Sequence, residues 1–223
     1  MIRLTIDGRA VTAATGADLL SVCLASGIFV PHLCYLPESP EPGGACRLCL
    51  VEVAGAVRPL CACTVTATEG MEVFTNTARV RELQKSALRL LLSAHHIDCA
   101  ACAANRRCGL QDTARFLGIG LTSAPHPGLL ANGAADTTHP QFDYLPHRCI
   151  LCGKCIRICR KHHPNVQLSF AGRGFKTLIT SFGITEKTAA ACAECLACIR
   201  VCPVGALLLK DGSLPEPAPG GPP

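Results

Sequence analysis

The chain has 223 residues, of which 17 are Cys, with 49% hydrophobic residues, 4% aromatic residues and a formal net charge of +5. The hydrophobic fraction excludes an intrinsically disordered protein, and no stretch approaches the roughly 18 consecutive apolar residues that a membrane span requires. The N-terminus carries no export signal, so we expect a cytoplasmic protein whose thiols stay reduced unless a metal binds them. The cysteines therefore predict metal or cluster ligands rather than disulfides.

The N-terminal third of the chain predicts a small α+β unit. Residues 1–13 alternate between polar and apolar around Asp7-Gly8, which predicts two strands joined by a turn. The next segment predicts an amphipathic helix that is capped near Thr15. Two further strands are expected over residues 48–54 and 71–75, and a further helix over residues 78–95. The last of these places His95 beside a Cys-rich turn.

The C-terminal half predicts a loop followed by an internal repeat. From Thr113 to Pro146 the chain is rich in Gly, Pro, Ala, Thr and His without a sustained period, which predicts a connecting loop. Residues 147–209 contain two copies of one Cys pattern on either side of a β-like stretch over 166–182, in which Gly172-Arg173-Gly174 is expected to form a turn. The Pro-rich C-terminal tail is expected to be flexible.

Two runs with the spacing C-x2-C-x2-C-x3-C dominate this half: Cys149, Cys152, Cys155 and Cys159, then Cys192, Cys195, Cys198 and Cys202. In bacterial two-cluster ferredoxins, three thiolates of such a run bind one [4Fe–4S] cluster and the fourth binds the other. The predicted ligand sets are therefore crossed: Cys149, Cys152, Cys155 and Cys202 for one cluster, and Cys159, Cys192, Cys195 and Cys198 for the other. Structural zinc sites are the alternative, but zinc gives no reason for the run to occur twice.

A second group of candidate ligands contains three cysteines, Cys99, Cys102 and Cys108, preceded by His95 and His96. A [4Fe–4S] cluster needs a fourth ligand here, and a neutral imidazole can bind iron. Replacing a thiolate by imidazole removes a negative charge, which by itself raises the reduction potential. A zinc site with three Cys and one His is the alternative.

A third group has the close pair and two outlying cysteines expected for a [2Fe–2S] cluster: Cys34, Cys46, Cys49 and Cys63. Gly43-Gly44 precedes Cys46 and allows the backbone to approach the inorganic sulfides. The spacing is not that of plant ferredoxins, and by spacing alone Cys61 could replace Cys63.

These motifs resemble the iron–sulfur diaphorase subunit of the soluble NAD-reducing [NiFe]-hydrogenases, which is similar to the N-terminal part of the large iron–sulfur subunit of respiratory complex I. The segments that carry the resemblance are PHLCYLP, GGACRLCLVEV, CTVTATEGMEV, HHIDCAACAANRRCGLQD, CILCGKCIRIC and CAECLACIRVCPVGAL. Counted back from Gly70-Met71, the resemblance selects Cys63 over Cys61. It also selects His95, four residues before the first Cys of its group, as the fourth ligand there.

The resemblance implies an α+β fold with consecutive parts. They are a β-grasp [2Fe–2S] ferredoxin domain over 1–77, a small [4Fe–4S] domain with one His and three Cys ligands over 78–118, a connecting loop over 119–142, a two-[4Fe–4S] ferredoxin domain over 143–210 and a flexible tail over 211–223. Complex I subunits and their formate dehydrogenase relatives continue into a further large domain. Because this chain stops shortly after Cys202, a free-standing electron-relay subunit is expected.

The expected function is electron transfer through one [2Fe–2S] and three [4Fe–4S] clusters. The implied partners are a flavin- and NAD-binding diaphorase subunit and the small and large hydrogenase subunits, which would make the chain part of a hydrogen:NAD+ oxidoreductase. No dinucleotide motif or acid–base pair predicts a substrate site within the chain itself. The alternatives are the same relay in an NAD-dependent formate dehydrogenase or a complex I-like assembly, and a structural zinc- or nucleic-acid-binding protein.

Two cysteines remain outside the predicted ligand sets. Cys23 is expected to be a buried apolar residue of the first helix, and Cys61 a neighbour of a ligand. Three further histidines are expected to form hydrogen bonds or lie on the surface: His96, His162 and His163. Basic residues near the ligands could compensate cluster charge or form an ordinary solvated face: Arg47, Arg106, Arg107, Lys154, Arg157, Arg160 and Arg200. Because bound thiolates offset the charge of +5, nucleic acid is not expected as a partner.

Overall fold

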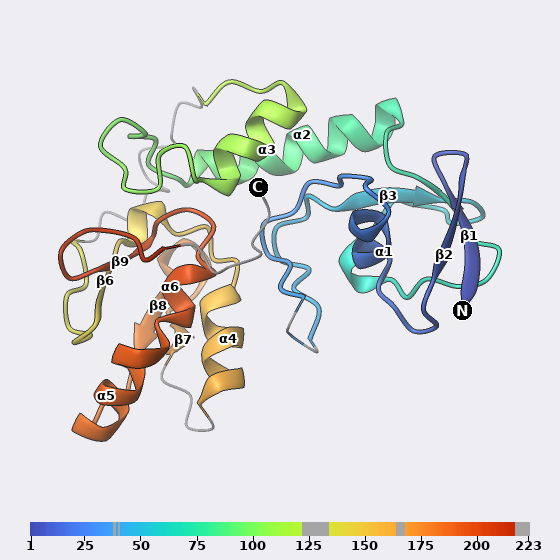
Figure 1. Ribbon diagram of the computed structural model, residues 1–223. Coiled ribbons are helices and arrows are strands. Elements are labelled where there is room, and N and C mark those ends of the chain that lie inside the picture. Colours follow the sequence, from blue (N-terminus) through green and yellow to red (C-terminus); the bar gives the residue numbers. More distant parts are fainter. Residues whose placement is uncertain (38, 40, 122–133, 164–167, 217–223) are drawn as a thin grey trace. The chain divides into compact units, whose positions relative to one another are not determined.

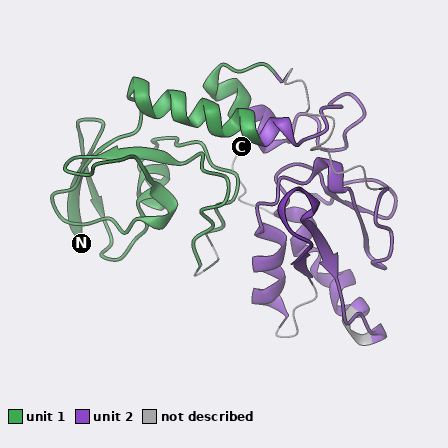
Figure 2. Cartoon of the chain, turned by 180° about the vertical axis from the view of Figure 1, so that it is seen from behind, with its two compact units in different colours: residues 1–90, 113–120 green, residues 91–112, 121–223 purple. Residues whose placement is uncertain are grey.

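The structure is a computed structural model that describes residues 1–37, 39, 41–121, 134–163 and 168–216 (Figure 1). The chain divides into two compact units, residues 1–90 with 113–120 and residues 91–112 with 121–223 (Figure 2). Two of the three divisions fall inside helices, α2 (Ala78–Ser93) and α3 (Gly109–Leu117). The five-part division expected from the sequence remains a prediction.

The first unit is built on a mixed five-stranded sheet. Its strands are β1 (Ile2–Ile6), β2 (Arg9–Ala13), β3 (Leu50–Val53), β4 (Leu60–Cys61) and β5 (Glu72–Phe74), in the order β2-β1-β5-β3-β4. Strand β5 joins two antiparallel hairpins, because it pairs in parallel with β1 of the β1–β2 hairpin and antiparallel with β3 of the β3–β4 hairpin. Asp7 and Gly8 turn the first hairpin with φ of 49° and 78°, as their sequence predicts. The predicted strands over 48–54 and 71–75 are confirmed as β3 and β5.

Helix α1 (Leu19–Ala25) packs on this sheet through its apolar face. Asp18 caps it by accepting a hydrogen bond from the Ser21 backbone N–H at 2.9 Å, so the prediction of a cap near Thr15 is wrong. Asp18 directly precedes the helix, so its carboxylate reaches the free N–H groups of the first turn. Thr15 lies three residues earlier in the chain and is too far from these groups. Cys23 is fully buried, as expected.

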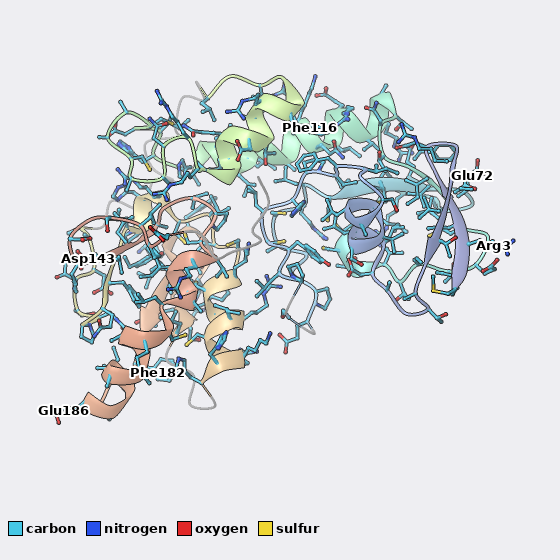
Figure 3. The ribbon with its side chains drawn as sticks, in the orientation of Figure 1. Arg3, Glu72, Phe116, Asp143, Phe182 and Glu186 are labelled. Atoms are coloured by element: carbon cyan, nitrogen blue, oxygen red, sulfur yellow. The ribbon has the colours of Figure 1, made fainter. Side chains whose placement is uncertain are left out.

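Helix α2 is tied to the sheet by a buried amide. The Gln84 side chain, which is inaccessible to solvent, donates a hydrogen bond to the Leu50 carbonyl at 3.0 Å. On the same unit, Phe116 of α3, which is labelled in Figure 3, makes an edge-to-face contact with Phe29, with 4.6 Å between the ring centres. The Arg81 guanidinium lies 4.4 Å from the centre of the Phe116 ring. These aromatic and cation–π contacts hold the end of α3 against the first unit.

The second unit contains the two long Cys runs. It consists of helices and two-stranded sheets: α4 (Lys154–His162), α5 (Glu186–Cys195), α6 (Ala197–Arg200), the pair β6 (Phe142–Tyr144) and β9 (Leu207–Leu209), and the hairpin β7 (Leu168–Ala171) and β8 (Leu178–Ser181). Each Cys run leads into a helix, α4 or α6, and these two helices pack together. The β-like stretch between the runs is the β7–β8 hairpin, with its turn at Gly172-Arg173-Gly174 as predicted.

The expected loop from Thr113 to Pro146 is wrong at both ends. Helix α3 continues to Leu117, with Thr113, Ala114 and Leu117 buried on one face, and β6 begins at Phe142. With Leu110 they form four buried positions at helical spacing, but Thr113 is polar and Ala114 is small, so the period does not stand out as an apolar pattern in the sequence. Residues 122–133 of the expected loop, like tail residues 217–223, lie outside the described part.

Within the second unit, the segment that carries Cys99, Cys102 and Cys108 lies close to the end of the second Cys run. The Gly109 N–H donates a hydrogen bond to the Pro203 carbonyl at 2.8 Å. Gly205 has a φ of +62°, and a Cβ there would come within 2.7 Å of the Ala104 Cβ, so only glycine fits this approach. No helix in the described ranges is long and apolar enough to cross a membrane.

Candidate iron–sulfur sites

The cysteine loops share an unusual backbone conformation. Five non-glycine residues of the described part have positive φ, and four of them lie inside the cysteine loops: Arg47 (57°), Arg106 (67°), Leu151 (52°) and Leu196 (45°). L-residues rarely adopt this conformation, because the Cβ crowds the backbone. It turns successive N–H groups toward one side, where they can surround an anion. The sequence gives no sign of these positions, because only Gly marks such backbone in advance.

Backbone donors indeed point at cysteine sulfurs. The Leu33 N–H donates to Cys46 Sγ at 3.5 Å, and the Cys46 N–H donates to Cys34 Sγ at 3.4 Å. In the second unit, the Leu151 N–H donates to Cys149 Sγ at 3.4 Å. Such bonds favour the thiolate, which is the form that binds iron.

The structure gathers five buried cysteines at the first candidate site. Cys34 contacts both Cys46 and Cys63 through thiol hydrogen bonds, which lower its pKa to about 2. Cys49 in turn contacts both Cys61 and Cys63. Cys63 is therefore the residue that joins the two halves of the predicted set, and Cys61 lies at its margin.

Cys61 has a different neighbour on its other side. Arg47 Nη1 donates a hydrogen bond to Cys61 Sγ at 3.3 Å. The pKa of Cys61 is lowered to about 6, chiefly by the hydrogen bond with the Cys49 thiol and further by Arg47. Arg47, one of the basic residues singled out in the sequence, thus contacts the leftover cysteine rather than a predicted ligand.

The middle site brings its three cysteines together at the start of α3. Burial raises the pKa of Cys108, and the charges on Cys102 and Cys99 raise it further. The backbone N–H groups of Leu110 and Gln111 donate to the Cys108 sulfur and lower the pKa. These donors belong to the first turn of a nine-residue helix, whose dipole favours a thiolate.

His95 is buried and has an unused nitrogen. Its Nδ1 has no hydrogen-bond partner in the described part of the chain, whereas its ring bonds to the backbone carbonyl of Arg148. Burial is the main cause that lowers the pKa of His95 to about 4, so the ring is neutral at pH 7 and keeps a lone pair for a metal. The structure gives His95 no hydrogen bond to the three cysteines among the described residues.

The two long Cys runs line two separate cavities of the second unit. One cavity is lined by Cys149, Cys152, Cys155 and Cys202. The other is lined by Cys159, Cys192, Cys195 and Cys198. Each cavity thus takes three cysteines from one run and the outlying cysteine from the other, which is the crossed grouping that the spacing predicts.

The electrostatics of these cavities suit a cationic core. Burial and then the charge on Cys202 raise the pKa of Cys152 to about 12. In the other cavity, burial and then the charge on Cys159 raise the pKa of Cys198 to about 12. Four thiolates cannot remain together there unless positive charge compensates them, and the iron of a cluster supplies it. The residues present therefore fit the clusters.

The remaining candidate residues have mixed roles. The ring of His96 packs against His147 at 5.5 Å, which agrees with a structural histidine, and His163 lines the cavity of Cys159. Arg200 Nη1 donates to the Cys195 carbonyl at 2.7 Å and so braces a cysteine loop. Across the described ranges, no three Cys, His, Asp or Glu side chains are arranged as a site for a single metal ion.

Three family descriptions match successive parts of the chain. Residues 1–78 match a 2Fe-2S iron-sulfur cluster binding domain, residues 84–121 match the NADH-ubiquinone oxidoreductase-G iron-sulfur binding region, and residues 148–206 match a 4Fe-4S dicluster domain. The fold and sites therefore define an iron–sulfur protein with one [2Fe–2S] and three [4Fe–4S] clusters. This confirms the predicted α+β fold class and cofactors.

Relatives of the chain place it more closely. It is 35% identical over 208 residues to a G-type NADH-quinone oxidoreductase subunit of Rhizobium meliloti, and the match covers 93% of this chain and 24% of that protein. It is 31% identical over 218 residues to the NADP-reducing hydrogenase subunit HndD of Solidesulfovibrio fructosivorans, covering 93% of this chain and 36% of that protein. The chain is thus an iron–sulfur chain similar to the N-terminal part of the G-type subunits of NADH-quinone oxidoreductase.

A solved structure matches nearly the whole chain. A chain of the NAD+-reducing [NiFe]-hydrogenase in its H2-reduced state superposes with a TM-score of 0.82 and 28% identity, covering 97% of this chain and 90% of that chain. By contrast, the chain spans about a quarter of the length of its Rhizobium meliloti relative. The chain is accordingly an iron–sulfur protein of the electron-transfer type.

Proposed function

We propose that this chain conducts electrons between a flavin- and NAD-binding diaphorase subunit and the small and large subunits of a cytoplasmic [NiFe]-hydrogenase. The observation that carries the proposal is the two-way coverage: 97% of this chain and 90% of a chain of an NAD+-reducing [NiFe]-hydrogenase superpose. The complex would be a hydrogen:NAD+ oxidoreductase, to which this chain contributes no substrate site.

The ligand sets that we propose are those expected from the sequence, and the two cavities and the contacts among the cysteines of the first site support three of them. The [2Fe–2S] cluster would be held by Cys34, Cys46, Cys49 and Cys63, and one [4Fe–4S] cluster by His95, Cys99, Cys102 and Cys108. The other two would be held by Cys149, Cys152, Cys155 and Cys202, and by Cys159, Cys192, Cys195 and Cys198. When bound, each cluster accepts and releases single electrons.

The chain's own residues would hold each cluster and adjust its potential. Backbone N–H groups such as that of Leu151 donate to ligand sulfurs, which stabilises the more negative reduced state. The walls beside the thiolates are apolar, with Ile179, Val204 and Leu207 lining one cavity, and so keep water from the sulfurs. The protein in this way determines spacing, burial and potential, and the cofactors carry the electrons.

The same relay in another assembly is the second candidate. The chain is 34% identical over 170 residues to a protein of Bacillus subtilis named putative formate dehydrogenase YrhE. The match to the NADH-quinone oxidoreductase subunit of Rhizobium meliloti covers 93% of this chain. An NAD-dependent formate dehydrogenase or a complex I-like assembly would need the same cluster chain with a different terminal subunit.

Metal analysis of the anaerobically purified native complex separates these assemblies. For the hydrogenase, we expect nickel together with more iron than the about 14 atoms that the four clusters of this chain require. Molybdenum without nickel would transfer the proposal to the formate-oxidising assembly. Zinc in place of iron would contradict the relay itself.

Replacing His95 by Cys tests the fourth ligand of the middle cluster. We expect H95C to keep its iron and to show a lower reduction potential for one [4Fe–4S] cluster, because a thiolate adds a negative charge that imidazole lacks. Electron paramagnetic resonance (EPR) during a redox titration measures this potential. The matched control is H96C, which should leave every potential in place. An unchanged signature in H95C, or the same shift in H96C, would exclude His95 as the ligand.

A further inference from the structure

A buried histidine outside the proposed ligand sets lines one of the two cluster cavities. His139 is only 3% exposed and borders the cavity of Cys159, Cys192, Cys195 and Cys198, together with Gln141 and Phe142. Its ring stacks on that of Phe142, with 3.8 Å between the ring centres and 18° between the planes. The stacking fixes the plane in which the two ring nitrogens lie.

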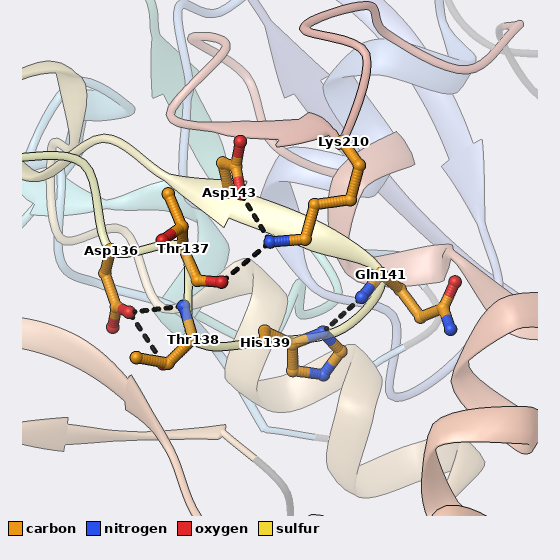
Figure 4. Close-up of polar contacts among 7 residues, drawn as sticks. All are labelled: Asp136, Thr137, Thr138, His139, Gln141, Asp143 and Lys210. Atoms are coloured by element: carbon orange, nitrogen blue, oxygen red, sulfur yellow. Dashed lines mark hydrogen bonds and ion pairs between the residues drawn. The ribbon is translucent and has the colours of Figure 1, made fainter.

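A single hydrogen bond determines which nitrogen of His139 carries the proton. The Gln141 backbone N–H donates to His139 Nδ1 at 3.1 Å (Figure 4). Because a backbone N–H can only donate, Nδ1 must be the unprotonated acceptor, and the single proton of the ring lies on Nε2. Pro140, between the two residues, restricts the backbone of His139 to an extended conformation and so favours this tight return. Among the described residues, Nε2–H has no acceptor.

The neutral state of the ring is consistent with its surroundings. The pKa of His139 is lowered to about 4, chiefly by burial and further by the positive charge of Lys210. Because the ring lines the cavity, an acceptor that occupies the cavity is available to this N–H group.

The loop that carries His139 is held at several points (Figure 4). Asp136 Oδ1 accepts hydrogen bonds from the backbone N–H of Thr138 at 3.0 Å and from its hydroxyl at 2.6 Å. Lys210 Nζ donates to the Thr137 carbonyl at 2.8 Å and to Asp143 Oδ1 at 2.6 Å. These contacts tie the loop to β6 and β9, so the ring is presented to the cavity by a fixed backbone.

We propose that His139 is a positioning residue whose Nε2–H donates a hydrogen bond to a sulfur of the cluster held by Cys159, Cys192, Cys195 and Cys198, and thereby raises its reduction potential. The proposal rests on the proposed function for the presence of that cluster. The reduced cluster carries one more negative charge than the oxidised one, so a donor stabilises the reduced state more strongly. This cluster should then have a higher potential than its thiolate ligands alone would give it.

The test compares H139L and H139Q in the full chain, purified anaerobically, by EPR-monitored redox titration. Leu removes the donor at similar size, so at a fixed potential we expect its reduced-to-oxidised ratio for one [4Fe–4S] cluster to fall about tenfold, equal to about 59 mV for a one-electron couple. Gln restores an N–H group and should recover at least half of this shift. H163L is the matched control, because His163 lines the same cavity but is only partly buried, and it should shift the potential much less.

The failures of the two proposals are distinguishable. If H139L keeps full iron content and an unchanged potential, or if H163L shifts the potential equally, the role of His139 is wrong and the relay stands. If C192S leaves the iron content and spectrum of the chain unchanged, no cluster occupies this cavity and the proposed function itself is contradicted there. Should H139L not fold, electron–nuclear double resonance of the wild-type protein in D2O decides, because a missing exchangeable deuteron at this cluster overturns the inference.

Discussion

Cys202→Ser is expected to remove about four iron atoms per chain, and to remove them from the cluster of Cys149, Cys152 and Cys155 rather than from that of its sequence neighbours. The reason is that Cys202 lines the cavity of the first Cys run, and the cavity of the second run is completed by Cys159. Serine keeps the size of the side chain but is a poor ligand for iron in place of a thiolate. Iron analysis and EPR of the anaerobic protein measure the loss.

Double variants identify which cluster is lost. C202S combined with C149S should lose no more iron than either single variant, because both residues serve one cluster. C202S combined with C192S should lose about eight iron atoms, since two clusters are then affected. The opposite pattern, in which C192S adds nothing to C202S, would mean that each run binds its own cluster and that the crossed assignment is wrong.

Cys63→Ser is expected to abolish the [2Fe–2S] cluster, with a loss of about two iron atoms per chain, and Cys61→Ser is expected to retain it. Cys63 contacts both Cys34 and Cys49, whereas Cys61 contacts Cys49 and Arg47. Loss of Cys63 therefore leaves one iron without a second ligand. The visible absorption spectrum and iron analysis distinguish the variants.

The two variants control for each other, because both residues are buried cysteines two positions apart on the same stretch of chain. A general disturbance of the loop would affect C61S and C63S alike. Retention of the cluster in C63S together with its loss in C61S would make Cys61 the ligand and contradict the proposed set.

Several features of the fold could be predicted because their cause is local. The Asp7-Gly8 pair specifies a hairpin turn, since both residues tolerate the left-handed conformation that the turn requires. The repeated spacing of the long Cys runs predicted the crossed grouping that lines the two cavities, because the same loop geometry must recur wherever three thiolates surround one cluster. In both cases a few consecutive residues contain the whole signal.

Other features depended on residues far apart in the chain. Spacing left Cys61 and Cys63 equivalent, and the family resemblance selected Cys63. The folded arrangement adds the reason, because Cys63 contacts both Cys34 and Cys49. Helix α3 was missed because its buried face is short and is stabilised partly by contacts such as that of Phe116 with Phe29. The N-cap at Asp18 was likewise misplaced to Thr15, as both residue types can cap a helix.

The sequence by itself determined the cluster types and the α+β fold of this protein, and it supplied four groups of candidate iron ligands. Ligand spacing is a property of the covalent chain, so it can be read from the sequence without knowledge of the fold. Only the tertiary structure decided which atoms surround those ligands, such as the left-handed residues of the cysteine loops and the His139 ring beside the second cavity. Reduction potentials depend on these surroundings, because hydrogen bonds and burial act through space and leave no pattern along the chain.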